Sequence, residues 1–450
     1  MLVLLAPAAA RAGAYLEAGH GSAARGVMRS PALPRGACAH CHVQGEGAAR
    51  FPKGLWREND NELCYACHRT EDLLGTYPGF EIYERSTHAF DARAAWPGPF
   101  PPARRDPRAA GKCLNCHDPH GKADRSGVIP SLLAVREGEL CLACHDGDPS
   151  TLDVARDVRK PYAHSPYRGG DRHDAREGGD PARYGYVGGN RHAACGDCHN
   201  AHAAARDAAP PLAPAASGRL ARVGRVRVLN GAAGMIPLFD YRPGNDTSTP
   251  ILEYEVCFKC HSSWTRQRPG EPDLAVAFNP NNPSFHPVEA PGKSATIDPN
   301  AFANGISASS TVFCGDCHGS DDSSARGPHG SRFSHLLRRA YDSRGGQLTT
   351  PDGLCFLCHR YDVYAGAAAG PAQRASRWNP PAAPSGHAFH VGQRNVGCFA
   401  CHESHGSTRF PALIVLGRLP GLQGFSASAA GGSCASACHS QRAYAVNYPR

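Results

Sequence analysis

The chain is poor in the residues that usually fill a protein interior. Its 450 residues include only 3 Met, 4 Trp and 8% aromatic residues, and alanine supplies much of the 41% hydrophobic content. No run approaches the ~18 consecutive apolar residues of a membrane-spanning helix, so no transmembrane span is expected. Glycine and proline stay below the range that is typical of disorder. We therefore expect a folded chain whose interior is filled by something other than side chains.

Cysteine and histidine, in contrast, are abundant, with 20 and 24 residues. Every cysteine falls into one pattern, because nine segments read C-x-x-C-H and a tenth reads C-x-x-x-C-H. We number these motifs 1 to 10 in chain order. Their cysteines are Cys38, Cys41, Cys64, Cys67, Cys113, Cys116, Cys141, Cys144, Cys195, Cys198, Cys257, Cys260, Cys314, Cys317, Cys355, Cys358, Cys398, Cys401, Cys434 and Cys438. The histidines that follow them are His42, His68, His117, His145, His199, His261, His318, His359, His402 and His439.

C-x-x-C-H is the attachment signature of c-type haem. Two thioethers form between the cysteine sulfurs and the vinyl groups of the porphyrin, and the adjacent His becomes the proximal ligand of the iron. Zinc sites do not require a His directly after each second Cys. Thioredoxin-like motifs occur once or twice in a chain, and a disulfide framework leaves the histidines unexplained. The pattern predicts ten covalently attached haems. For the longer motif at Cys434, an unmodified cysteine pair is the alternative.

The remaining fourteen histidines are candidates for the second axial, or distal, position. Methionine cannot serve ten irons, because only Met28 and Met235 remain after the first residue. Bis-histidine ligation is therefore expected. The distal set that we predict is His20, His88, His120, His164, His192, His202, His286, His329, His390 and His405. The expected spares are His40, His173, His335 and His387, and His387 could exchange with His390.

Some of these histidines follow a motif closely, as His120 does in CHDPHG, His202 in CHNAH and His405 in CHESHG. A His three residues past the proximal one cannot reach the opposite face of its own porphyrin. We therefore expect each of these trailing histidines to ligate a neighbouring haem and so to join two haems through a few residues of backbone.

The motifs divide the chain into five units of two haems each. We place these units at residues 15–86, 87–160, 161–285, 286–386 and 387–450. The third unit is expected to contain a β-hairpin, with alternating strands near 222–228 and 251–256. Short helices should carry the second motif of each unit. The predicted fold class is mostly irregular coil with short α-helices and minor β-structure, organised around a chain of haems that replaces the apolar core.

Thioether attachment takes place outside the cytoplasm, so we expect an exported protein. Residues 1–14 resemble the end of a signal peptide, and the alternative is a short apolar N-terminal helix. The formal charge of +8 could indicate nucleic-acid binding. We reject that interpretation, because haem propionates outweigh the surplus and arginines suit them as partners. The Arg-rich segment 219–227 is one candidate for such pairing.

With its paired C-x-x-C-H motifs, the chain resembles the multihaem c-type cytochromes of metal-reducing bacteria. The resemblance implies a periplasmic, outer-surface or extracellular electron carrier in respiration, with redox proteins or extracellular acceptors as partners and no nucleic acid. Some members form filaments, in which a His near one subunit's N-terminus ligates a haem of the next subunit, a role that His20 could play by analogy. An electron-transfer protein is the main hypothesis. The alternatives are a filament or outer-membrane conduit subunit and a multihaem nitrite or hydroxylamine-type oxidoreductase, although no motif here ends in Lys. No catalytic residue is predicted.

Overall fold

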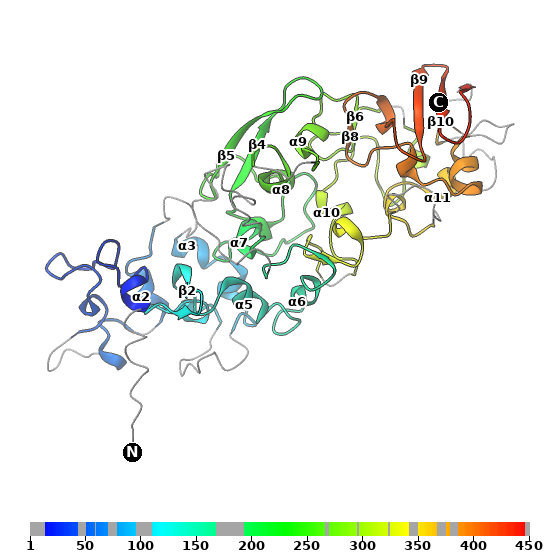
Figure 1. The fold of residues 1–450 in the computed structure, drawn as a ribbon. Helices are drawn as coiled ribbons and strands as arrows, with labels where there is room; N and C mark the ends of the chain where they lie inside the picture. Colours follow the sequence, from blue (N-terminus) through cyan, green and yellow to red (C-terminus); the bar gives the residue numbers. More distant parts are fainter. Residues whose placement is uncertain are drawn as a thin grey trace.

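In a computed structural model, the protein is an elongated body that follows the order of its sequence. The N-terminal units lie at one end and the C-terminal unit lies at the other (Figure 1). The structure describes residues 14–43, 51–58, 60–70, 79–95, 110–167, 193–265, 270–294, 297–322, 325–341, 350–366, 375–378 and 386–445. Irregular coil dominates these residues, with short helices and small sheets, which confirms the predicted fold class.

The helical elements are short. The α-helices are α2 (Asn61–Tyr65), α3 (Phe80–Tyr83), α4 (Thr87–Phe90), α5 (Glu137–Leu142), α6 (Val154–Asp157), α7 (Cys195–Cys198), α8 (Glu253–His261), α9 (Leu274–Ala277), α10 (Cys314–Cys317) and α11 (Tyr361–Tyr364). The 3-10 turns are η1 (Cys38–His40), η2 (Pro52–Gly54), η3 (Cys113–Asn115), η4 (Pro130–Leu132), η7 (Gly218–Leu220), η8 (Pro299–Ala301), η9 (Ser334–Leu336), η10 (Leu354–Leu357), η12 (Cys398–Ala400) and η13 (Pro411–Leu413), and η11 (Ala388–Gln393) is a π-turn. Among the described residues, no helix is long and apolar enough to cross a bilayer.

The sheets are all antiparallel and small. Their strands are β1 (Ala123–Asp124), β2 (Gly127–Val128), β3 (Tyr162–Ala163), β4 (Arg225–Leu229), β5 (Leu238–Arg242), β6 (Ser284–Phe285), β7 (Gly330–Ser331), β8 (Gly406–Ser407), β9 (Leu422–Ser428), β10 (Gly431–Ser436) and β11 (Arg442–Ala445). Strands β1–β2, β3–β7, β4–β5 and β6–β8 form two-stranded sheets, and β11–β10–β9 form the one sheet of three strands in the described part of the chain. Both β3–β7 and β6–β8 join segments that lie far apart in the sequence.

Apolar side chains gather in several small clusters. The largest surrounds α8, where Tyr254 and Phe258 are buried with Phe278 and Val288. The other clusters contain two or three buried residues each. Apolar burial of this extent stabilises only local pieces of a 450-residue chain, so the thin core anticipated from composition is present.

The hairpin of the third unit consists of β4 and β5, which pair from Arg225 with Arg242 to Leu229 with Leu238. The expectation of a second strand at 251–256 is wrong, because residues 253–256 form the start of α8. In a helix, Tyr254 and Phe258 stand on one face and both reach the same apolar cluster. Helical backbone also continues through the sixth motif to its histidine.

Part of the Arg-rich segment in this unit is already paired within the protein and cannot pair with propionates. Arg225 is fully buried; its Nε lies 3.2 Å from Glu255 Oε2, and its terminal nitrogens donate to the carbonyl oxygens of Asp246 and Thr249. Arg225 therefore holds the hairpin and its following loop to α8.

The second motifs of the units differ in their backbone. Motifs 2, 4 and 6 begin on α2, α5 and α8, as expected, and motif 8 begins on η10. Motif 10 departs from the expected helix, because Cys434 lies within strand β10, between β9 and β11.

Candidate haem-ligating sites

The histidines that follow the odd-numbered motifs share one hydrogen bond. In each, Nδ1 lies 2.7–3.0 Å from a backbone carbonyl oxygen of a short turn. The pairs are His42 with Lys53, His117 with Ser131, His199 with Arg219, His318 with His335 and His402 with Ala412. Because a carbonyl only accepts, the proton is on Nδ1 and the lone pair of Nε2 is free to bind a metal.

The turns that supply these carbonyls explain the aliphatic patches between the motifs. Ser131, His335 and Ala412 have φ between 55° and 58°, a left-handed conformation that turns the carbonyl toward the imidazole. The aliphatic residue that follows then forms a β-bridge with the same His, as Leu133 does with His117 and Ile414 with His402. His335, one of the expected spares, therefore contributes its backbone to the site of His318.

Nine of the ten motif histidines face a second histidine at a nearly constant distance. The ring centres are 5.8–6.2 Å apart in the pairs His20–His68, His42–His120, His88–His145, His117–His202, His164–His261, His199–His329, His318–His405, His387–His402 and His390–His439. A metal–nitrogen bond of about 2 Å on each side would separate two imidazole centres by about 6 Å. The residues present therefore fit an iron held between two imidazoles.

The remaining motif histidine, His359 of motif 8, has His286 as its neighbour. His286 is half-buried and interacts electrostatically with His359. Burial and this neighbour lower the pKa of His359 to about 4. Burial likewise lowers the pKa of His117 to about 4 and that of His329 to about 3. The imidazoles of His117, His329 and His359 are therefore neutral at physiological pH, which is the form that ligates iron.

The partners follow a rule that spans the units. In units 2 to 5, the His that trails the first motif faces the first motif of the preceding unit: His120 faces His42, His202 faces His117, His329 faces His199 and His405 faces His318. The His upstream of each unit's first motif faces the second motif of the same unit, as His20 faces His68 and His88 faces His145. The segment CHVQGEG at motif 1 contains no trailing His.

Each upstream His is also held beside a trailing His of the next unit. His164 and His329 directly continue the β3–β7 ladder, and the His164 N–H donates to the His329 carbonyl at 3.1 Å. The β6–β8 ladder is continued in the same way by His286 and His405, at 2.8 Å. His20 is held by its side chain instead: its Nδ1 lies 3.1 Å from the carbonyl oxygen of Pro119, which precedes His120. These contacts between an upstream and a trailing segment hold one unit against the next.

Glycine follows three of the trailing histidines for a steric reason. A Cβ at Gly330 would overlap the carbonyl oxygen of Asp157, and one at Gly406 would overlap the carbonyl oxygen of Ala277. At Gly121 it would overlap the side chain of Ala18. The HG dipeptide therefore lets the trailing segment approach the neighbouring unit closely.

The last unit differs from our expectation. His387, an expected spare, faces His402, and His390 faces His439. Nδ1 of His390 lies 2.9 Å from the carbonyl of Gly386, just before His387, so the bond that joins units elsewhere is local here. The predicted ligand His192 and the spare His173 lie outside the described residues.

Two other histidines have positions that bear on the sequence analysis. His40, the third expected spare, is buried, and its ring nitrogens lie 3.0 Å from the Arg29 amide and 2.9 Å from the Pro34 carbonyl. Both nitrogens are used, so His40 has no free lone pair for a metal. His20 faces His68 of its own chain rather than pointing away from it.

The ten motifs lie in single file in sequence order. The Cys64 side chain lies beside Cys113 of the next motif, and the pairs Cys141–Cys195, Cys257–Cys314 and Cys355–Cys398 lie side by side in the same way. The intervening steps bring Cys41 near Cys67, Cys116 near Cys141, Cys198 near Cys260, Cys317 near Cys358 and Cys401 near Cys434. None of the twenty cysteines forms a disulfide.

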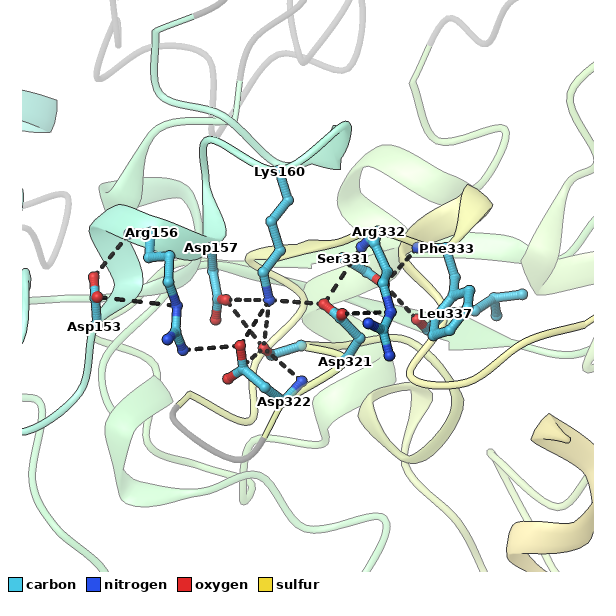
Figure 2. A network of polar contacts seen from close by, with 11 residues as sticks. Asp153, Arg156, Asp157, Lys160, Asp321, Asp322, Ser331, Arg332, Phe333 and Leu337 are labelled. Carbon is cyan, nitrogen blue, oxygen red and sulfur yellow. Dashed lines mark hydrogen bonds and ion pairs between the residues drawn. The ribbon is translucent and has the colours of Figure 1, made fainter. Parts of the chain in front are cut away.

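A polar network fixes the longest of the trailing segments. His329 follows His318 by eleven residues instead of three, and the added loop carries Asp321 and Asp322. Lys160 Nζ lies 2.6 Å from Asp157, which is fully buried, 2.7 Å from Asp321 and 3.1 Å from Asp322. Figure 2 shows Lys160 at the centre of these carboxylates, with Arg156 and Arg332 at its edges. The network attaches the loop to α6, next to the β3–β7 ladder.

Comparison with known families matches residues 106–150 to the doubled CXXCH motif family. This segment holds motifs 3 and 4 with the trailing His120. No curated protein matches the chain, and no solved structure matches it either. The doubled motif supports a multihaem c-type cytochrome that carries covalently attached haem c and acts in electron transfer. Such attachment is typical of an exported protein.

Proposed function

We propose that the protein is a ten-haem electron-transfer cytochrome in which every iron has two histidine ligands. The observation that carries this proposal is the constant ring separation of 5.8–6.2 Å in nine His pairs, each of which contains one motif histidine. Motif 10 has the same arrangement in spite of its longer spacing, because His390 and His439 are 6.2 Å apart. This supports attachment at Cys434 and Cys438.

The chemistry that bound haems supply is reversible one-electron transfer. A distal histidine opposite each motif histidine occupies the position at which a substrate would bind. The protein therefore conducts and does not catalyse a reaction of a substrate. The chain's own residues space the sites and, at the odd-numbered motifs, fix the Nδ1 protons, which tunes the iron.

The single-file order of the motifs supports conduction from one end of the chain to the other. Because cysteines of successive motifs lie close together along the described chain, an electron that enters at motif 1 would pass the other motifs in turn before it leaves at motif 10, or travel the reverse way. We propose a periplasmic or extracellular site of action in respiration, with redox proteins or extracellular acceptors at the two ends.

Two measurements on exported holoprotein test this function. Its intact mass should exceed that of the processed polypeptide by about ten haem masses; nine would remove the assignment at Cys434, and none would overturn the proposal. Electron paramagnetic resonance of the oxidised protein should show low-spin iron throughout, and the reduced protein should bind no carbon monoxide. A haem that binds carbon monoxide in the native protein would favour the oxidoreductase alternative.

A further inference from the structure

The surplus positive charge of the chain lies at its two ends. Residues 15–57 contain six Arg or Lys and two Glu, and residues 363–450 contain seven Arg and one Glu. The 305 residues between them hold 34 basic and 37 acidic side chains. An oxidised bis-His haem adds about one net negative charge. The two ends then stay positive, at about +3 and +4, whereas the middle becomes strongly negative.

Ion pairing sharpens this contrast. In the middle, basic side chains meet carboxylates, as Arg136 meets Asp124 at 2.8 Å. In residues 363–450 the single acidic residue, Glu403, forms an ion pair with Arg418. Arg394, Arg409 and Arg442 are exposed, and within the described ranges no carboxylate lies within 4.0 Å of them. Their charge is therefore available to a partner.

Two of these arginines flank the last site. Arg394 follows His390 by four residues, and Arg442 pairs across the sheet with Cys434 of motif 10. The loop before β9 lies beside the same motif, because the Ala437 N–H donates to the Gly421 carbonyl at 3.0 Å. That loop presents Leu419, which is 79% exposed. An apolar contact rimmed by unpaired charge is the composition of a transient protein interface.

We infer that this surface, defined by Arg394, Leu419 and Arg442, docks an acidic redox protein beside motif 10. The inference rests on the proposed function. Positive ends also repel each other, so the same charge distribution disfavours end-to-end association of two copies of this chain. Electrostatic attraction of an acidic partner to the surface would raise the rate of encounter and make that rate fall with salt.

The test uses the oxidised holoprotein and a reduced flavodoxin as an acidic protein probe. Stopped-flow absorbance follows haem reduction between about 0.01 and 0.5 M salt. The whole holoprotein is slightly negative, so its net charge predicts a rate that rises with salt. The docking surface predicts the opposite slope, and a rate that falls about tenfold in the double variant Arg394→Glu/Arg442→Glu.

Two control variants locate the effect. Arg125→Glu reverses an exposed charge in the middle of the chain and should change the rate little. Arg25→Glu/Arg35→Glu reverses two exposed charges at the other end. A rate that rises with salt, or one that depends on Arg25 and Arg35 but not on Arg394 and Arg442, overturns the inference. Haem content and full reduction by dithionite test the proposed function separately, and they should be the same in all variants.

Discussion

His387 faces His402 with ring centres 6.1 Å apart, and it lies three residues before His390, which faces His439 at 6.2 Å. In the preceding units, the His that faces the first motif comes from the next unit. His387 takes that place in the last unit, so under the proposed assignment the two histidines of this site both come from unit 5.

The first prediction separates His387 from His192, the ligand that we expected from the sequence. His387→Ala should leave one haem five-coordinate, because no other imidazole faces His402 among the described residues. One equivalent of high-spin iron and one of bound carbon monoxide per protein should appear by electron paramagnetic resonance and absorbance. His192→Ala should leave both signals absent. The reverse pattern would assign the site to His192 and contradict the observed pairing.

The position of His387 shows where sequence reasoning ends. Spacing identifies the motifs and the trailing histidines, and it indicates that a trailing His serves another haem. It cannot decide between His192, three residues before Cys195, and His387, eleven residues before Cys398. That choice depends on which backbone lies beside His402 after folding. The local turn at η11 brings His387 there, and nothing in composition or periodicity encodes that contact.

The segment 251–256 shows a second limit. Its alternation of apolar and polar residues is typical of a strand, yet residues 253–256 start α8. Tyr254 and Phe258, four residues apart, share one face of that helix and are buried in the same cluster, a spacing that a strand would also place on one face. Tertiary contacts therefore decide between two local conformations that the pattern alone leaves open. Strand β4, which overlaps the expected segment 222–228, was easier to predict, because burial alternates from Val226 to Leu229; its partner β5 was not expected.

The second prediction concerns the close approach at Gly406. Gly406→Ala should push β8 away from Ala277, because the new Cβ would overlap the Ala277 carbonyl oxygen. His405 would then leave His318, and one haem should become high-spin and bind carbon monoxide. Gly292→Ala is the matched control, because a Cβ there meets no atom within 4 Å. Unchanged low-spin spectra for Gly406→Ala would show that β8 does not hold His405 in place.

The third prediction concerns Lys160. Lys160→Met leaves Asp157 buried without its cation and frees the loop that carries Asp321 and Asp322. Breaking a buried ion pair on one side costs about 3–5 kcal/mol. The denaturant midpoint should fall, and the iron between His199 and His329 should become partly high-spin.

The exposed pair of Arg360 with Asp362 provides the control for Lys160. Arg360→Ala should change stability by no more than about 1 kcal/mol and should leave the spin state intact. The double variant Lys160→Met/Asp157→Asn removes the unpaired buried charge and should recover part of the stability. If stability recovers but the high-spin signal remains, Lys160 positions His329 in addition to stabilising the fold. Equal losses in Lys160→Met and Arg360→Ala would contradict the role of the network.

The last prediction concerns the pH dependence of stability. Burial raises the pKa of Glu289 from 4.5 to about 7, against a 2.6 Å hydrogen bond that Asn230 Nδ2 donates to Oε2. Below pH 4.5 the carboxyl is protonated in both the folded and the unfolded chain. Between pH 4.5 and 7 only the unfolded chain loses the proton, so folding stability falls as pH rises, by about 3 kcal/mol for the full shift.

Glu289→Gln should therefore raise the denaturant midpoint of the holoprotein at pH 8 and leave it nearly unchanged at pH 4.5. Glu253, whose pKa burial also raises to about 7, should retain a weaker dependence of the same sign in that variant. Glu17→Gln, at an exposed position, should shift neither midpoint. A Glu289→Gln variant less stable than the native protein at pH 8 would show that Glu289 is buried as a stabilising anion.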